Sequence, residues 1–249
     1  MKRWLRRHIT NEGELLRRVV CFPHAGGTAG TFSRWPQLLP AGTETVVVQY
    51  PGRQDRISEP CIEDMNQMAD ALTAEIADLT DLPIVLFGHS MGSAVAYEVA
   101  VRMERDLAYP ADALFVSGRT APHRRPGETN HLLGDEDLIA ALRQLGGDTA
   151  GVYDLPKLWP LILPPLRSDL RLLNGHRPRH LTPLRTPIVA LGGDSDHTCS
   201  LSELEAWGDA TTLGVAVHAF PGGHHYLMQH EEAVVGMISR HSRSFTAPR

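Results

Sequence analysis

A serine between two glycines is the first feature of this sequence that could do chemistry. Residues 88–92 read Gly-His-Ser-Met-Gly, the pattern G-x-S-x-G, after the apolar stretch PIVLF and before the small-residue stretch SAVAYEVA. In such a strand-to-helix corner the serine sits on a strained turn that exposes its hydroxyl. The bland alternative is a serine that only caps the following helix. We interpret Ser90 as a nucleophile.

A serine hydroxyl needs a base to accept its proton, and the base needs an acid to orient it. In folds that carry this motif the chain order is Ser, then Asp or Glu, then His. The stretch GGDSD offers Asp194 and Asp196, and FPGGHHYL offers His224 and His225. Asp194 directly follows a glycine and suits a turn, whereas Asp196 can extend toward the base. Adjacent side chains cannot both enter one small site, so only one histidine is expected to be the base.

An oxyanion also needs hydrogen-bond donors. One donor in this architecture is the backbone N–H after the nucleophile, here that of Met91, and the other comes from a loop after an early strand. The stretch FPHAGG supplies that loop, and we expect the second donor at Ala25. The neighbouring His24 is expected to line the substrate pocket rather than to act as a base.

Short apolar, β-branched runs alternate with helical patterns along the chain, which predicts an α/β fold with a mostly parallel, doubly wound sheet. Each run is apolar nearly throughout, so the strands are expected to be buried on both faces. The predicted strands are 17–22, 43–50, 82–89, 111–118, 186–193 and 214–220. The predicted helices are 64–79, 93–103 and 231–241.

Residues 119–185, called the helical insertion below, interrupt this alternation. They hold helical patterns over 135–145, 155–162 and 165–174 but no convincing strand. A long helical segment between two strands is typical of a lid over one end of a sheet. We therefore expect one α/β domain over residues 1–249 with this insertion as its lid.

Composition excludes several classes of function. The net charge of −5 argues against broad nucleic-acid binding, and no apolar run is long enough to span a membrane. Cys21, Cys61 and Cys199 are too few and too irregularly spaced for a disulfide framework, so we expect reduced thiols in a cytoplasmic protein. Residues 1–18 hold six Lys or Arg against two Glu. We expect this basic arm to be a solvated, partly disordered tail.

Taken together, the motifs resemble those of type II thioesterases, the free-standing α/β-hydrolase enzymes of polyketide and nonribosomal peptide assembly lines. The similar stretches span most of the chain: FPHAGG, YPGRQDR, GHSMG, SGRTAP, LPPLRSDLRL, GGDSD and FPGGHHYL. The resemblance implies that His224 is the base and Asp196 the acid. His225 departs from the family pattern, which usually has an aromatic residue there, and is expected to be a wall of the substrate pocket. His176 also departs, where similar chains often carry tyrosine.

The resemblance further implies a substrate and partners. The acyl group is expected on the phosphopantetheine arm of an acyl or peptidyl carrier protein, and its hydrolysis would clear blocked modules. No metal or diffusible cofactor is expected, nor contact with a membrane, and the protein is expected to be a monomer. The alternatives are a carboxylesterase, an acyl-CoA hydrolase or acyltransferase, and, in another class, a non-catalytic module that binds carrier proteins.

Two further expectations concern charged residues of the helical insertion. Arg124 and Arg125 are expected to contact the carrier protein, with the basic arm as a weaker candidate. In the stretch LRSD, Arg167 and Asp169 are expected to pair with each other at the base of the lid.

Overall fold

A twisted seven-stranded sheet forms the centre of the computed structural model, which describes residues 4–9, 13–124, 129–146 and 150–243. The strands lie in the order β1-β3-β2-β4-β5-β6-β7. β1 is antiparallel to β3, and every other neighbouring pair is parallel. The strands are β1 (Leu5–His8), β2 (Arg17–Phe22), β3 (Thr43–Val48), β4 (Ile84–His89), β5 (Ala113–Ser117), β6 (Ile188–Gly193) and β7 (Val215–Phe220).

All six strands expected from the apolar runs are present, and the prediction of a mostly parallel sheet is confirmed. Strands β3 to β6 are buried at every residue. The expectation of two buried faces is wrong for β7, where Ala216, His218 and Ala219 are exposed. β7 is the last strand of the sheet and has only β6 beside it, so part of its surface stays in contact with solvent.

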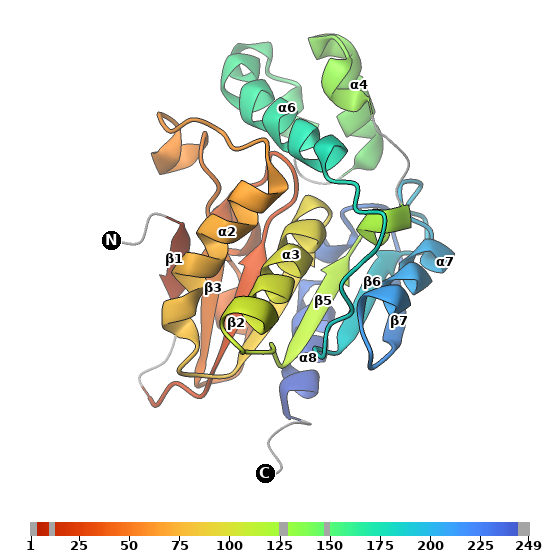
Figure 1. The fold of residues 1–249 in the computed structure, drawn as a ribbon. Coiled ribbons are helices and arrows are strands. Elements are labelled where there is room, and N and C mark those ends of the chain that lie inside the picture. The colour runs from red at the N-terminus through yellow and green to blue at the C-terminus, as the bar shows by residue number, and fades with distance from the viewer. Residues whose placement is uncertain (1–3, 10–12, 125–128, 147–149, 244–249) are drawn as a thin grey trace.

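Helices cover both faces of the sheet (Figure 1). Helices α2 (Met65–Ile76) and α3 (Met91–Asp106) bury their apolar side chains in the core on one face. Helix α8 (Glu231–Arg243) and the short α1 (Trp35–Leu38) form the core on the other face. The short α7 (Leu201–Leu204) follows β6. The predicted helices 64–79, 93–103 and 231–241 are confirmed, each with slightly different ends.

The helices of the helical insertion lie beyond one end of the strands, at the top of Figure 1. It contains α4 (Asp135–Leu145), α5 (Ala150–Tyr153) and α6 (Trp159–Gly175). The prediction of two separate helices over 155–162 and 165–174 is wrong, because α6 continues through Pro164 and Pro165. A proline normally breaks a helix because it lacks an N–H donor. Here the turn with the prolines is held by packing, since Leu163 and Leu166 lie in one buried cluster with residues of α4.

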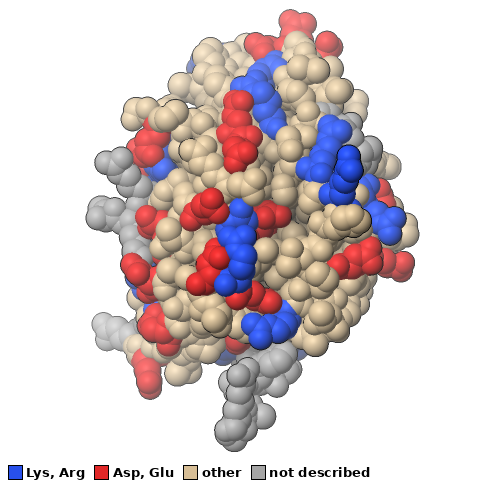
Figure 2. Space-filling view, viewed as in Figure 1, with Lys and Arg blue, Asp and Glu red and all other residues tan. Residues whose placement is uncertain are grey.

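The basic N-terminal arm is not a free tail in the residues that the structure describes. Arg6 pairs with Asp55, and Arg7 reaches Glu44 at 2.5 Å. Arg18 is buried and contacts Glu44 at 2.8 Å and Asp81 at 2.6 Å. The arm is also held by the pairing of β1 with β3 at the edge of the sheet, because this pairing satisfies backbone groups that would otherwise face water. Figure 2 shows acidic and basic side chains interspersed on the face of the molecule that is seen in Figure 1.

The cysteines and the helices of the described residues are as follows. Cys21, Cys61 and Cys199 are all free thiols. Within the described ranges, every helix is too short or too polar to cross a lipid bilayer.

Candidate active site

Ser90 lies at the sharp corner between β4 and α3. Its backbone has φ 53° and ψ −115°, a conformation that residues other than glycine rarely adopt. The flanking glycines are a steric requirement. A Cβ on Gly88 would overlap the carbonyl of Gly92, and a Cβ on Gly92 would overlap the carbonyl of Phe22. The predicted strand–turn–helix context of the serine is therefore confirmed, and the strain is of the kind stored at functional sites.

An acid and a base meet beside this corner. The loop after β6 carries Asp196 and the loop after β7 carries His224, and Asp196 Oδ2 lies 2.8 Å from His224 Nδ1. Asp194 points elsewhere: its Oδ1 accepts hydrogen bonds from the N–H of Gly222 at 3.0 Å and from Ser195 Oγ at 2.9 Å. The two aspartates therefore divide as expected, one toward the imidazole and one into a turn.

Thr198 joins the acid and the base, and the sequence analysis did not single it out. Its N–H and hydroxyl lie 2.8 and 2.7 Å from Asp196 Oδ1, and the hydroxyl also lies 3.0 Å from His224 Nδ1. A hydroxyl has one hydrogen, which here goes to the carboxylate, so toward the imidazole it can only accept. His224 Nδ1 must then carry the proton, and Nε2 is left as an acceptor.

These contacts also keep the acid ionised. Burial by itself raises the pKa of Asp196, but the hydrogen bonds from His224 and Thr198 outweigh it, so the pKa lies below its usual range. A carboxylate beside Nδ1–H stabilises the imidazolium that forms when Nε2 accepts a proton. The pair is thus built to remove a proton from a group near Nε2.

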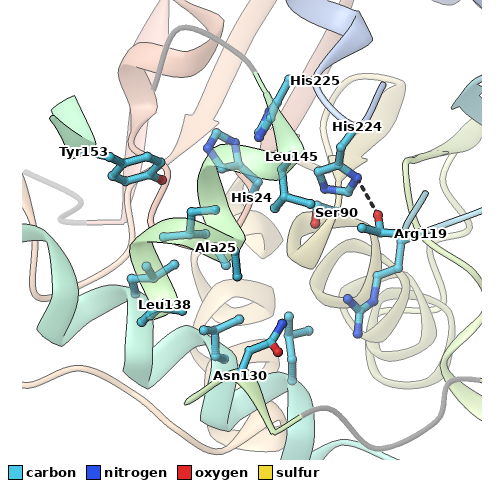
Figure 3. Close-up of a pocket in the computed structure, with 16 residues that line it drawn as sticks. His24, Ala25, Ser90, Arg119, Asn130, Leu138, Leu145, Tyr153, His224 and His225 are labelled. Carbon is cyan, nitrogen blue, oxygen red and sulfur yellow. Dashed lines mark hydrogen bonds between the residues drawn. The ribbon is translucent and has the colours of Figure 1, made fainter. Parts of the chain in front are cut away.

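Ser90 and His224 open into one cavity of about 110 Å³ between the sheet and the helical insertion. The ring of His224 points toward Ser90, with Arg119 and Asn130 on another side of the space (Figure 3). Most of the remaining wall is apolar and comes from helices α4 and α6. Those residues are Leu138, Ala141, Leu142, Leu145, Leu166, Leu170 and Leu173.

Of the two expected oxyanion donors, Ala25 is in the cavity wall, and Met91 directly follows Ser90 in the chain. Ala25 belongs to the loop after β2. Met91 is the first residue of α3, where the helix leaves N–H groups without an intrahelical acceptor and carries partial positive charge. Among the described residues, no group of three or more His, Cys, Asp or Glu side chains is placed to hold a metal ion.

The family of this chain follows from its similarity to known proteins. A family model for the thioesterase domain matches residues 17–241. The chain belongs to the thioesterase family. It is 38% identical over 232 residues to a probable cadicidin biosynthesis thioesterase of Streptomyces griseus, covering 93% of this chain and 64% of that one. It is 36% identical over 239 residues to thioesterase PikA5 of Streptomyces venezuelae, covering 96% and 85% respectively.

A solved structure refines the assignment. The type II thioesterase BorB, from the borrelidin biosynthetic cluster, superimposes with a TM-score of 0.87 at 38% identity, over 96% of this chain and 97% of that one. The similarity to type II thioesterases and the α/β-hydrolase fold are both confirmed. This chain spans about two thirds of the length of the Streptomyces griseus relative but nearly all of BorB.

Three further histidines lie around His224 in this thioesterase. His24 and His225 line the cavity with their rings 5.0 Å apart, and His89 lies 5.9 Å from the former and 5.6 Å from the latter. Burial lowers the pKa of His24 to about 3 and that of His225 to about 4, and it lowers that of His89 strongly as well. All three side chains are therefore neutral at physiological pH. His24 and His225 line the cavity, as a pocket-wall role requires, whereas His89 lies behind them.

The predicted pair of Arg167 and Asp169 is wrong. Arg167 points outward and pairs with Asp135 of α4 at 2.6 Å. Asp169 points inward and pairs with Arg53 of the YPGR stretch at 2.6 Å. Residues two apart on a helix project in different directions, so each finds its own partner.

Of the two arginines expected to contact a partner, Arg124 lies on the outer surface of this thioesterase. Arg124 is about two thirds exposed and lies 3.5 Å from Asp209. Arg125 lies outside the described residues. His176 is not among the cavity residues and instead lies 3.2 Å from Glu98, at the end of α6.

Two kinds of site residue escaped the sequence analysis. Arg119 and Asn130 line the cavity from the helical insertion. Arg119 is the arginine of the SGRTAP stretch, whereas Asn130 lies in none of the motifs. Thr198 lies two residues after Asp196, and that short spacing was the available signal, because a threonine there can bond back to the carboxylate.

Proposed function

We propose that this thioesterase hydrolyses acyl thioesters with Ser90 as nucleophile, His224 as base and Asp196 as the acid that orients it. The observation that supports this assignment most directly is the 2.8 Å contact between Asp196 Oδ2 and His224 Nδ1 in a site that shares its cavity with Ser90. The strained backbone at the serine adds to it.

In the first half-reaction Ser90 Oγ attacks the thioester carbonyl while His224 Nε2 accepts the hydroxyl proton. The carbonyl oxygen becomes an oxyanion held by the N–H groups of Ala25 and Met91, and one such donor is worth ~3 kcal/mol in the transition state. The C–S bond then breaks, and the proton on Nε2 passes to the leaving sulfur. An acyl ester on Ser90 and a free thiol remain.

In the second half-reaction water attacks the acyl ester, and His224 Nε2 accepts a proton from that water. The new oxyanion collapses, the bond to Ser90 Oγ breaks, and Nε2 returns its proton to the serine. The product is a free carboxylic acid. Each step uses only side chains, backbone amides and water, so the mechanism requires no metal or cofactor.

The substrate is proposed to be an acyl group on the phosphopantetheine arm of an acyl or peptidyl carrier protein. Two observations support this choice. Two of the proteins named above, the Streptomyces griseus relative and BorB, are described as belonging to biosynthesis or to a biosynthetic cluster. The cavity wall is mostly leucine, which suits an aliphatic acyl chain beside Ser90. In that setting hydrolysis would free modules blocked by aberrant acyl groups, an editing role.

The chemistry is tested with Ser90→Ala. Release of free acid from an acyl-pantetheine thioester should fall ~10⁴-fold or more, and labelling by a fluorophosphonate should disappear. Ser202→Ala is the matched control, since Ser202 is an exposed serine outside the cavity. A Ser90→Ala protein that keeps a tenth of the activity would remove Ser90 from the mechanism. A wild-type protein that neither labels nor turns over would indicate a non-catalytic carrier-binding module.

The substrate class is tested by presenting one acyl group on a carrier protein, on coenzyme A, on pantetheine and as an oxygen ester. Carrier-bound substrate should have the highest kcat/KM, because docking adds binding energy remote from the reacting bond. Arg124→Glu combined with Arg125→Glu should reduce that advantage and leave the pantetheine reaction unchanged. Equal efficiency on carrier and coenzyme A would indicate an acyl-CoA hydrolase, and preference for the oxygen ester a carboxylesterase.

A further inference from the structure

The buried carboxylate of Asp169 connects three parts of the chain. Asp169 belongs to α6 of the helical insertion and is 1% exposed. Its Oδ2 accepts hydrogen bonds from the N–H of Gly26 at 2.8 Å and from Arg53 Nη1 at 2.6 Å, and its Oδ1 accepts one from Arg53 Nη2 at 2.8 Å. One side chain of the insertion thus holds both the loop after β2 and the YPGR stretch after β3.

Stability alone does not explain this arrangement. A buried ion pair loses about as much in desolvation as it gains in attraction, so apolar residues of similar size would often serve the fold equally well. Two neighbouring contacts also reach the loop after β2. Arg53 Nη1 lies 3.4 Å from the carbonyl oxygen of Gly27, and the Tyr50 hydroxyl donates to the carbonyl oxygen of Pro23 at 3.2 Å.

That loop carries the proposed oxyanion donor at Ala25. The N–H of Gly27 bonds to the carbonyl of His24 at 2.9 Å and closes a tight turn, and Gly26 within it has φ +74°. The N–H of Gly26, which donates its hydrogen bond to Asp169, is the next amide after that of Ala25. Fixing the direction of one amide in so tight a turn restricts the direction of its neighbour.

Helix α6 touches this turn twice. A Cβ on Gly26 would lie 3.2 Å from Cδ1 of Leu166, which is three residues before Asp169 and therefore on the same side of the helix. Leu166 also lines the cavity that holds Ser90. The position of α6 and the shape of the turn are consequently coupled by one apolar and one charged contact.

We propose that Asp169 is a positioning residue through which helix α6 holds the turn at Ala25 in the geometry that binds the oxyanion. The inference rests on the proposed function, because it assigns a role in the same acyl-transfer step. It implies that a displacement of α6 weakens oxyanion binding without any change at Ser90, His224 or Asp196.

The first experiment compares Asp169→Ala with Arg53→Met. Both changes break the same ion pair, but only the first removes the acceptor of the Gly26 N–H. We expect kcat/KM for an acyl-pantetheine thioester to fall about 100-fold in Asp169→Ala, the scale of losing one oxyanion donor, and less than tenfold in Arg53→Met. Glu44→Ala is the control for stability, because Glu44 is a fully buried partner of Arg18 at the start of β3, at the opposite end of the sheet. Its kcat/KM should remain at the wild-type value.

The second experiment separates positioning from general damage. A trifluoromethyl ketone analogue of the acyl-pantetheine forms a tetrahedral adduct with Ser90 and needs the oxyanion donors, whereas an inert amide analogue binds without them. In Asp169→Ala the inhibition constant of the ketone should rise about 100-fold, in step with the fall in kcat/KM, and the affinity for the amide should change less than threefold. Equal losses for the two analogues would overturn the inference.

If Asp169→Ala does not fold, Asp169→Asn decides by the same ratio. Its amide offers one acceptor atom where the carboxylate has two, so we expect about a tenfold rise in the ketone constant with unchanged amide affinity. A folded variant with wild-type ketone affinity would overturn the inference. Ser90→Ala keeps the two proposals apart. Activity that survives that change defeats the proposed function, whereas an inactive Ser90→Ala beside a fully active Asp169→Ala defeats only the role of Asp169.

Discussion

The rings of His224 and His225 lie 5.2 Å apart and nearly perpendicular, at 83°. Both residues line the same cavity, so the expectation that adjacent side chains cannot share one small site is wrong, but their rings face different partners. His224 turns its Nδ1 to Asp196, and the ring of His225 packs edge-on against His24. These directions support His224, rather than His225, as the proposed base.

Substituting each of the two histidines should give opposite results. His224→Ala should reduce kcat/KM ~10⁴-fold, as expected for loss of a triad member. His225→Phe should keep the chemistry and change mainly which acyl groups are accepted, because it replaces one ring of the cavity wall by another. Steady-state kinetics on thioesters of increasing chain length measure both effects. An active His224→Ala beside an inactive His225→Phe would show that the pair is assigned the wrong way round.

The two aspartates should differ just as clearly. Asp196→Asn should lower kcat ~10⁴-fold, because an amide in place of the carboxylate disturbs the tautomer of His224 and no longer stabilises its charged form. Asp194→Asn should cost less than tenfold, since the side chain of Asp194 bonds to the turn at Gly222 and Ser195 and not, in the described residues, to His224. Single-turnover kinetics on one thioester provide the measurement. A larger loss in Asp194→Asn would contradict the assignment of the acid.

Thr198 should contribute modestly but measurably. Thr198→Val keeps the shape and removes the hydroxyl that bonds to Asp196 and His224, so kcat should fall three- to tenfold, in line with ~1 kcal/mol for one hydrogen bond. Thr198→Ser restores the hydroxyl and should return kcat to within twofold of the wild type. The pH profile of kcat should shift in the valine variant and return in the serine variant. Equal activity of all three proteins would show that the hydroxyl has no role.

The buried histidines should make the fold sensitive to acid. The pKa of His225 is about 4 and that of His24 about 3 in the folded protein, against about 6.5 in an unfolded chain. Below pH 6.5 these two histidines therefore bind protons in the unfolded chain but stay neutral in the folded protein. The stabilisation is complete above pH 6.5 and is lost as the pH falls toward 4, by up to about 1.4 kcal/mol per pH unit for each histidine.

His225→Phe tests this dependence, since it removes one of the groups that titrates differently in the two states. The free energy of unfolding from urea titrations at pH 7, 6 and 5 should fall less steeply in the variant than in the wild type. Parallel curves for the two proteins would contradict a depressed pKa at His225.

The sequence by itself determined the strands β2 to β7, the corner at Ser90 and the chain order of the proposed reacting groups, but not the edge strand β1. Continuous apolar runs report burial on both faces, which only a covered parallel sheet provides. The glycines around Ser90 report a turn too tight for a Cβ, and that is a local steric fact. Such features depend on neighbours along the chain, and the sequence lists those neighbours directly.

Only the tertiary structure decided which distant side chains meet. Asp169 pairs with Arg53, 116 residues away, rather than with Arg167. The arginines of the N-terminal arm are ordered by carboxylates on other segments, and α6 continues through Pro164 and Pro165 because its buried side packs on α4. The physical reason is common to all three. A charge or an apolar side chain takes the partner that folding brings within a few ångströms, and that proximity is a property of the packed chain rather than of spacing along it.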